Sequence, residues 1–303
     1  MGINMFNTPI LLITFNRPSH TRKILEVIRA QQPRQLYVFQ DGARLNNEHD
    51  KNKCLEVRKI IDEVVDWRCD LKTYFSDINL GCGPGPYKAI SWFFENVEYG
   101  IILEDDLDPH IYFFDYCEKM LTMYMNEPKV GLITGHNQHR IYTKKTSYYF
   151  TFNMSGTLGW ATWRRVWKDF DFDIKYNREE LDCALKEHYG LPRPYRDYEN
   201  RLYKIWITDD RSDVWDHMFK YYLLLNGYLD VKPNSCLVSH LGTDADATHS
   251  GYTDPGYMME INDSLFPNLI HPKDVKISSE EYKRIMIKSI KIIIKRFLRI
   301  IDY

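Results

Sequence analysis

The residues best placed to do chemistry are three consecutive acids, Glu104, Asp105 and Asp106, which follow the apolar run GIIL at residues 100–103. Carboxylates this close together repel one another unless a cation offsets their charge. A divalent ion does so economically, and carboxylate oxygens suit Mn²⁺ or Mg²⁺, ions that bridge the phosphates of a nucleotide. An acidic turn without a metal is the alternative for so short a motif. The neighbouring segments must therefore decide between the two.

Two other apolar segments also end in polar side chains. The segment Pro9 to Phe15 is followed by Arg17, and the segment Gln35 to Gln40 ends at Asp41. Ligands of parallel sheets bind at the carboxyl ends of strands, so these side chains are expected to meet the three acids there. Arg17 suits a diphosphate, and Asp41, taken as a carboxylate with a free acceptor, suits a base edge or a ribose.

Two features later in the chain could serve a sugar. Asp216 follows Trp215 at the start of a predicted helix, where partial burial would raise its pKa toward that of a general base. An aspartate that opposes the helix dipole is the commoner alternative. The run Gly156 to Trp160 predicts a tight turn with an aromatic platform for a sugar, although a tryptophan in such a run is more often part of the core.

The elements that must position these residues alternate regularly over the first hundred residues. Short apolar runs predict strands at 9–15, 35–40, 72–75 and 100–103, and helical spacing predicts helices at 20–31, 48–65 and 87–96. A helix at 113–125, a strand at 130–134 and an aromatic stretch at 148–167 follow. The alternation predicts an α/β fold with a mostly parallel sheet flanked by helices.

The order of the motifs resembles a known family. ILLITFNR, FQDG, GPYKAI, GIILEDDLDP, GTLGWATW, VWDHMF and LVSHLGTDADATHSG, over roughly residues 9–251, resemble the N-acetylglucosaminyltransferase I type of nucleotide-sugar transferase and its bacterial relatives. The resemblance implies a GT-A fold, Mn²⁺-dependent transfer from a UDP-sugar, and inversion at the anomeric carbon. It is expected to extend to the enzyme class and not to the identity of the sugar or acceptor.

On the donor side, the resemblance places Arg17 near the diphosphate and Asp41 on the uracil. Glu104 and Asp105 would lie toward the sugar and ribose, with Asp106 as the direct metal ligand. Lys88 and Trp160 are further donor-binding candidates.

On the acceptor side, Asp216 matches the family's catalytic base, and the segment from His240 to Gly251 corresponds to a loop that closes over the donor. His249 is an additional candidate metal ligand. Roles for His136, His139 and Asn137 stay unassigned.

Composition narrows the remaining classes. Forty basic and 42 acidic side chains give a net charge of −2, which argues against a protein that binds nucleic acid over its whole surface. The six cysteines form no CxxC pair, so we expect reduced thiols and neither a zinc site nor a redox dithiol. No apolar run reaches the length of a membrane span, and the start of the chain has no export signal. A cytoplasmic protein is expected.

The end of the chain has a different composition. From 283 to 303 there are seven Lys or Arg and one acid, Asp302, interleaved with isoleucines. At about 100° per residue, the basic residues at 284, 288, 291, 295 and 299 fall within an arc of about 80°, opposite an apolar face. This predicts a basic amphipathic helix and an anionic membrane surface as a partner, at the inner face of the cell membrane.

The sequence as a whole predicts three parts: a donor-binding half at 1–108, an acceptor-binding and catalytic-base half at 109–272, and the C-terminal helix at 273–303. The function expected is that of an inverting, metal-dependent glycosyltransferase acting on a glycan acceptor, lipid-linked, in surface polysaccharide or lipopolysaccharide synthesis. The alternatives are a sugar nucleotidyltransferase, disfavoured because TFNRPS lacks a glycine, and an inactive glycan-binding GT-A scaffold.

Overall fold

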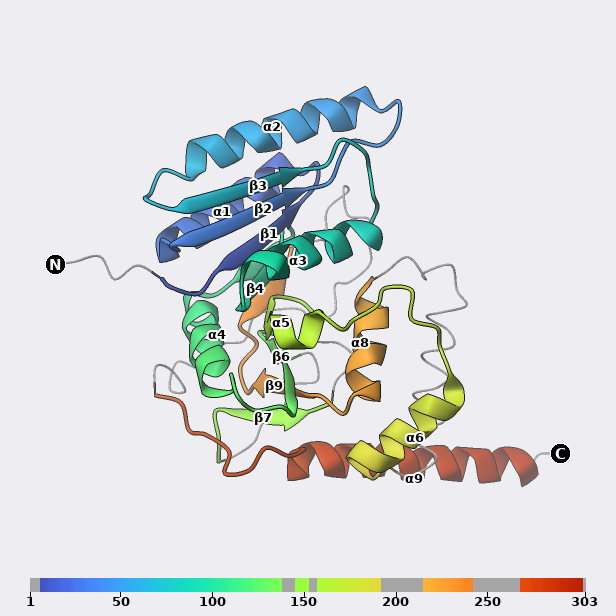
Figure 1. The fold of residues 1–303 in the computed structure, drawn as a ribbon. Coiled ribbons are helices and arrows are strands. Elements are labelled where there is room, and N and C mark those ends of the chain that lie inside the picture. The colour runs from blue at the N-terminus through green and yellow to red at the C-terminus, as the bar shows by residue number, and fades with distance from the viewer. Residues whose placement is uncertain (1–5, 138–144, 153–156, 192–214, 242–267, 302–303) are drawn as a thin grey trace.

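The computed structural model of the chain describes residues 6–137, 145–152, 157–191, 215–241 and 268–301. Its centre is an eight-stranded sheet in the order β3-β2-β1-β4-β8-β6-β9-β7, flanked by helices (Figure 1). The strands of this sheet are β1 Ile10–Thr14, β2 Gln35–Gln40, β3 Asp70–Phe75, β4 Tyr99–Glu104, β6 Val130–Thr134, β7 Tyr148–Thr151, β8 Trp160–Trp163 and β9 Leu229–Pro233. The predicted α/β class with a largely parallel central sheet is confirmed.

The first four strands of that order are parallel to one another, in the arrangement of one half of a Rossmann-like fold. All five residues of β1 are buried, as expected for a strand covered on both faces. In the register, Ile13 lies opposite Glu104, and Thr14 lies opposite Gln40. The carboxyl ends of β1, β2 and β4 therefore meet at one edge of the sheet, as predicted.

The helices that connect these strands begin and end where local chemistry favours it. Helix α1, Pro18–Gln31, opens with a proline in its first turn and buries Ile24, Leu25 and Ile28 on one face. It ends before Gln32, whose φ of 47° is left-handed. Helix α2, Glu48–Val64, is capped by the side chain of Asn47. Helices α3, Pro84–Asn96, and α4, Ile111–Met123, lie within three residues of their predicted bounds.

The second half of the sheet departs from the parallel pattern. Strand β8 pairs antiparallel with both β4 and β6, and β7 pairs antiparallel with β9. A separate two-stranded sheet joins β5, Leu107–Pro109, to β10, Val238–His240. The sequence analysis predicted none of these antiparallel pairings. One sheet runs through residues on both sides of position 108, and the expected division into three parts stays a prediction.

Three helices complete the described fold beyond the short α5, Arg164–Trp167. They are α6, Arg178–Tyr189, α8, Trp215–Leu225, and α9, Ser279–Ile301. The C-terminal helix is thus present where it was predicted. Within the described part of the chain, no helix combines the length and the apolar character that crossing a membrane requires.

Candidate functional site

The three acids stand at the carboxyl edge of the sheet, where β4 ends at Glu104. Arg17, at the start of α1, reaches them across this edge: its Nη1 lies 3.1 Å from Asp106 Oδ2 and 3.5 Å from Asp105 Oδ1. The backbone N–H of Phe15 also donates to Asp105 Oδ2 at 3.3 Å. The predicted meeting of Arg17 with the acids is therefore confirmed, and we call Glu104, Asp105 and Asp106 the acidic tip.

The pKa values of all three carboxyl groups in the acidic tip depart from their ordinary values. Burial, followed by repulsion from the neighbouring carboxylates, raises the pKa of Glu104 to about 8 and that of Asp105 to about 7. Burial also acts to raise the pKa of Asp106, but His240 and Arg17 outweigh it, so this pKa lies below its ordinary value. Protonation of Glu104 and Asp105 is thus favoured while no further cation is present, and a bound cation would offset the mutual repulsion of the three carboxylates.

His240 is the residue of this site that the sequence analysis did not single out. Pairing of β10 with β5 sets His240 opposite Leu107, and its Nε2 lies 3.5 Å from Asp106 Oδ2. The next residue, Leu241, donates its backbone N–H to the Asp106 carbonyl at 2.7 Å. Imidazole and carboxylate are both ligands of Mn²⁺-type ions. A histidine inside the LVSH segment was the available signal, but nothing local joins it to Asp106.

Asp216 lies near the acidic tip as the second residue of α8, and its charge helps to raise the pKa of Glu104. Its Oδ2 forms an ion pair with Lys220 and lies 3.5 Å from Thr157 Oγ1. Its Oδ1 lies 3.9 Å from His217 Nε2 and, among the described residues, has no hydrogen-bond partner although it is buried.

The charges around Asp216 decide its ionisation. Burial acts to raise its pKa, but the Lys220 ammonium and His217 outweigh burial and hold the pKa below its ordinary value. The expectation that desolvation raises this pKa is therefore wrong. Asp216 is ionised at neutral pH, with one oxygen held by Lys220 and the other available to a proton.

The tryptophans behind Asp216 form a packed aromatic core. Trp160 is 1% exposed and stacks on Trp215 with ring centroids 5.7 Å apart. Trp167 and Phe219 also pack against Trp160, at 6.3 and 5.5 Å. Trp160 is therefore part of this core, with other rings packed against it, and its contact with the donor stays a prediction. The turn beside Trp160 contributes Thr157, next to Asp216.

Asp41 is buried and satisfied by its own loop. Its Oδ1 accepts backbone N–H bonds from Gly42 at 2.9 Å and Leu80 at 2.8 Å. Its Oδ2 accepts from Gly81 and from the side chain of Asn79, both at 3.0 Å. The premise of a free acceptor is therefore wrong, since the four positions of the carboxylate are taken. Asp41 holds the glycine-rich turn in place, and its contact with uracil stays a prediction.

Three further residues named from the sequence have other surroundings. Lys88 is exposed on α3, and its ammonium lies 5.0 Å from the centre of the Tyr74 ring, so the structure does not bring it to the acids. His136 and Asn137, just after β6, are each 1% exposed, and the Asn137 side chain donates to the Asn234 carbonyl at 3.3 Å and accepts from Tyr149. His139, His249 and Gly156 lie outside the described residues.

The residues present fit a divalent cation in one specific way. No group of three or more His, Cys, Asp or Glu side chains that could hold a metal is found in the described ranges. Mg²⁺ and similar ions are commonly held by one or two protein ligands, with water and substrate phosphates supplying the rest. Asp106 and His240 are such a pair, so a site here would be completed by a bound diphosphate.

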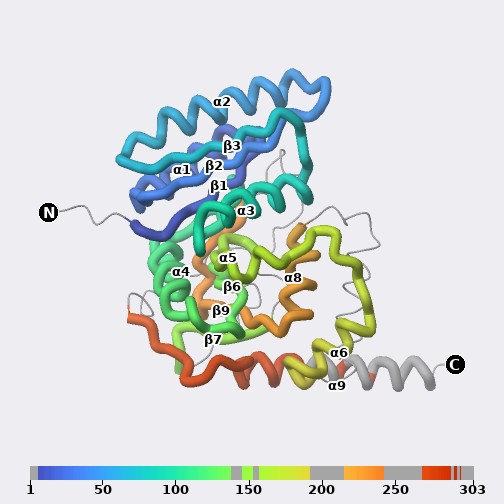
Figure 2. Tube along the Cα trace, viewed as in Figure 1, coloured from blue at the N-terminus to red at the C-terminus, as the bar shows by residue number. Residues whose placement is uncertain are grey.

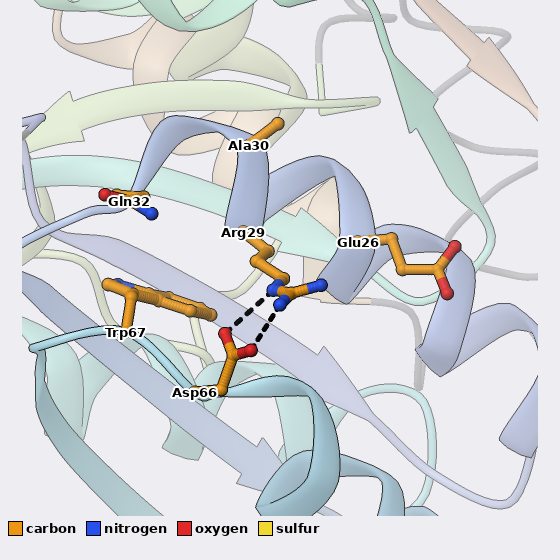
Figure 3. Close-up of a pocket in the computed structure, with 6 residues that line it drawn as sticks. All are labelled: Glu26, Arg29, Ala30, Gln32, Asp66 and Trp67. Carbon is orange, nitrogen blue, oxygen red and sulfur yellow. Dashed lines mark hydrogen bonds and ion pairs between the residues drawn. The ribbon is translucent and has the colours of Figure 1, made fainter. Parts of the chain in front are cut away.

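A hollow in the described surface lies elsewhere. It has a volume of about 530 Å³ and lies at the opposite edge of the sheet, where α1 and α2 end (Figure 3). Its lining residues are Glu26, Arg29, Ala30, Gln32, Asp66 and Trp67. Arg29 and Asp66 pair across it, and no residue singled out from the sequence lines it.

Comparison with known proteins adds little beyond the fold. No family model and no curated protein matches the sequence. Among solved structures, the chain is similar to a 4-diphosphocytidyl-2C-methyl-D-erythritol synthase from Anaerococcus prevotii, with 10% identity and a TM-score of 0.33. The match covers 61% of this chain and 84% of that one. At this TM-score the similarity carries no argument about activity.

Proposed function

We propose that this chain is an inverting, metal-dependent glycosyltransferase that moves a sugar from a UDP-sugar to a glycan acceptor. One observation carries the proposal: Asp216, from the second half of the chain, lies close enough to the acidic tip to influence the pKa of Glu104. A cation and diphosphate site opposite an ionised carboxylate is the arrangement that direct displacement of a nucleotide from a sugar requires.

On the donor side, Asp106 and His240 would hold Mn²⁺ or Mg²⁺. When bound, that ion neutralises charge on the diphosphate as the nucleotide leaves. Arg17 lies against the same carboxylates and is the nearest cation that this chain itself supplies. Glu104 and Asp105 would face the sugar and ribose, and an acidic surface there is compatible with hydroxyl groups, which donate to carboxylates.

On the acceptor side, Asp216 would take the proton from the attacking hydroxyl. The acceptor oxygen forms a bond to the anomeric carbon as the bond from that carbon to the phosphate oxygen breaks, and the electron pair leaves with UDP. The proton goes to Oδ1, because Oδ2 is already held by Lys220 and faces Thr157. A single displacement inverts the configuration at the anomeric carbon.

The alternative class is a sugar nucleotidyltransferase, which also combines a parallel sheet with a metal-binding carboxylate. The solved structure reported above is a nucleotidyltransferase, and its TM-score of 0.33 does not decide between the classes. A nucleotidyltransferase cleaves a nucleoside triphosphate and has no need of a carboxylate base for a sugar hydroxyl. The ionised Asp216 therefore supports the glycosyltransferase, and an inactive glycan-binding scaffold would need neither Asp106 nor Asp216.

The experiment that separates these classes measures the product. We expect the protein with Mn²⁺ to release UDP from a UDP-sugar, faster with a glycan acceptor, and to lose this activity in Asp106→Asn, with Asp115→Asn, an exposed acid on α4, as the matched control. Pyrophosphate release from a nucleoside triphosphate and a sugar phosphate would favour the nucleotidyltransferase. Glycan binding without either release would favour the scaffold.

The pathway is part of the same proposal. A lipid-linked glycan in the synthesis of a surface polysaccharide or lipopolysaccharide is the acceptor we propose, at the inner face of the cell membrane. What supports it is α9, which carries basic residues and isoleucines at the end of the chain. Transfer to a glycan carried on a polyprenyl diphosphate, compared with the same glycan free in solution, tests this step: equal rates would contradict it.

A further inference from the structure

Helix α9 is joined to the body of the protein through its first turns. The backbone N–H of Ser278, just before the helix, donates to the Phe150 carbonyl of β7 at 3.0 Å, and the Ser278 hydroxyl accepts from Glu281. Glu281 is 3% exposed and accepts from Thr151 at 3.2 Å, and Ile285 is completely buried. The N-terminal part of α9 is therefore fixed against the edge strand of the sheet.

The opposite side of the helix is open. Ile287, Ile290 and Ile294 are 55%, 51% and 51% exposed, although each is a large apolar side chain. At about 100° per residue they fall within an arc of about 60°, and Ile294 lies about 180° from the buried Ile285. The body of the protein therefore covers one side of α9 and leaves the isoleucine side uncovered. We call Ile287, Ile290 and Ile294 the isoleucine face.

The charges near this face select among the partners that could cover it. Lys283 and Lys291 are exposed beside the isoleucine face, and the segment 283–303 carries seven Lys or Arg against one acid. Figure 2 shows the coloured, N-terminal part of α9 along one border of the molecule. A second copy of the chain would bring like charges together at a helix pair, which costs free energy. An anionic lipid surface instead neutralises the lysines while the isoleucines enter the boundary between headgroups and acyl chains.

We infer that the isoleucine face of α9 is a membrane-binding surface that lies in the headgroup layer of an anionic bilayer. The helix enters the interface with its axis parallel to the surface, since its first turns are held against β7. The binding needs no donor or acceptor, so it stands or falls independently of the transferase proposal. The bilayer would contact a face of α9 that is already uncovered in the folded protein.

Vesicle sedimentation with the full chain tests the inference. We expect binding to vesicles of phosphatidylcholine with about 30% phosphatidylglycerol, weak binding to phosphatidylcholine alone, and loss of binding at high salt. The triple variant Ile287→Ser, Ile290→Ser, Ile294→Ser should bind at least about tenfold more weakly, because the apolar area that enters the lipid is removed. Lys283→Gln with Lys291→Gln should weaken binding and reduce its dependence on salt.

The control is Ile78→Ser, which changes an isoleucine that is 65% exposed far from α9 in the sequence. Equal thermal stability of all variants would show that the fold is kept. Absence of wild-type binding to anionic vesicles, or undiminished binding of the folded isoleucine variant, would overturn the inference. Sedimentation velocity without lipid tests whether a second copy of the chain covers the isoleucine face instead. A wild-type dimer that the isoleucine variant fails to form would overturn the membrane inference in favour of self-association.

Discussion

The two edges of the same sheet carry similar charged residues in very different surroundings. At the carboxyl edge, Glu104, Asp105 and Asp106 meet Arg17 with little access to water, and their pKa values are displaced in both directions. At the opposite edge, Arg29 and Asp66 are about half exposed and form an ion pair (Figure 3). The pair raises the pKa of Arg29 and lowers that of Asp66, so both stay charged at neutral pH, as they would be without the pair.

This contrast in surroundings indicates which edge of the sheet is suited to chemistry. The hollow opens to solvent, and its ion pair is complete and screened by water. The acidic tip is largely shielded from water, and its three carboxyl groups do not ionise together without mutual repulsion; displaced pKa values of this kind are a property of sites that bind cations or transfer protons.

Asp106→Asn should have the largest effect. Loss of the carboxylate that faces both His240 and Arg17 should reduce Mn²⁺-dependent transfer about 1,000-fold, because a metal ion supplies several kcal/mol of charge stabilisation. Mn²⁺ binding followed by electron paramagnetic resonance should weaken in parallel. Full Mn²⁺ binding in this variant would contradict the assignment of the metal to Asp106.

Asp216→Asn should reduce turnover about 100- to 10,000-fold, the range for loss of a general base. Binding of UDP with Mn²⁺ should be unchanged, since Asp216 faces the acceptor in the proposed reaction. Titration calorimetry of UDP and steady-state kinetics on the same preparation separate the two effects. A variant that binds UDP as poorly as it turns over would place Asp216 on the donor side instead.

Lys220→Met should make turnover depend more steeply on pH. Lys220 is the largest favourable influence on the charge of Asp216, so its loss should raise the pKa of Asp216 and move the acidic limb of the kcat profile upward. Each unit of that shift costs about tenfold at low pH and little at high pH. Lys220→Arg should restore the profile, and Lys186→Met, at an exposed lysine of α6, should leave it unchanged. An equal loss at every pH would indicate a purely structural role.

Glu104→Gln should stabilise the protein at alkaline pH without metal. The pKa of Glu104 is about 8 in the folded chain and near 4.5 in an unfolded one, so the folded state holds the extra proton between these values. Its contribution to the free energy of unfolding is therefore fully present below about pH 4.5 and is lost as pH rises through 8. The melting temperature of the variant should exceed that of the wild type at pH 8.5 and match it at pH 4.

The matched control for that variant is Glu95→Gln, at an exposed position of α3. It should leave the melting temperature unchanged at both pH values. A Glu104→Gln variant that is no more stable than the wild type at pH 8.5 would mean that the acidic tip is not strained by its own charge.

Arg29→Ala should have the smallest effect. Its ion pair with Asp66 is exposed on both sides, and exposed pairs contribute little to stability. Melting temperature and transfer rate should both stay within experimental error of the wild type. A loss of transfer would show that the hollow, and not the acidic tip alone, takes part in function.

Much of the first half of the fold was predictable from sequence. The apolar runs at β1, β2 and β4 are nearly continuous, as buried parallel strands require, and the polar residues that follow them mark one edge. The second half was less predictable because β8 is short, rich in tryptophan and inserted antiparallel between strands distant in sequence. Its pattern WATW is typical of core packing as much as of a binding surface.

The candidate site was predictable only as far as its parts are local. Arg17 and the acids follow adjacent strands, so their meeting follows from the sheet. His240 joins them through the pairing of β10 with β5, and no local sequence pattern predicts this pairing. For Asp41 and Trp160 the residue type suits a ligand, but the surroundings are set by tertiary contacts that the local sequence does not indicate. Residues of the loop 79–81 hydrogen-bond the Asp41 carboxylate, and the Trp215 ring stacks on Trp160.

The sharpest test of the proposed metal and diphosphate site is the binding of UDP in the presence and absence of Mn²⁺. We predict that UDP raises the melting temperature of the wild type when Mn²⁺ is present, by mass action, and that GDP and CDP do so less. The effect should disappear in Asp106→Asn and persist in Asp216→Asn. A wild-type protein that no nucleoside diphosphate stabilises with Mn²⁺, or one stabilised equally after loss of Asp106, would contradict the proposed site.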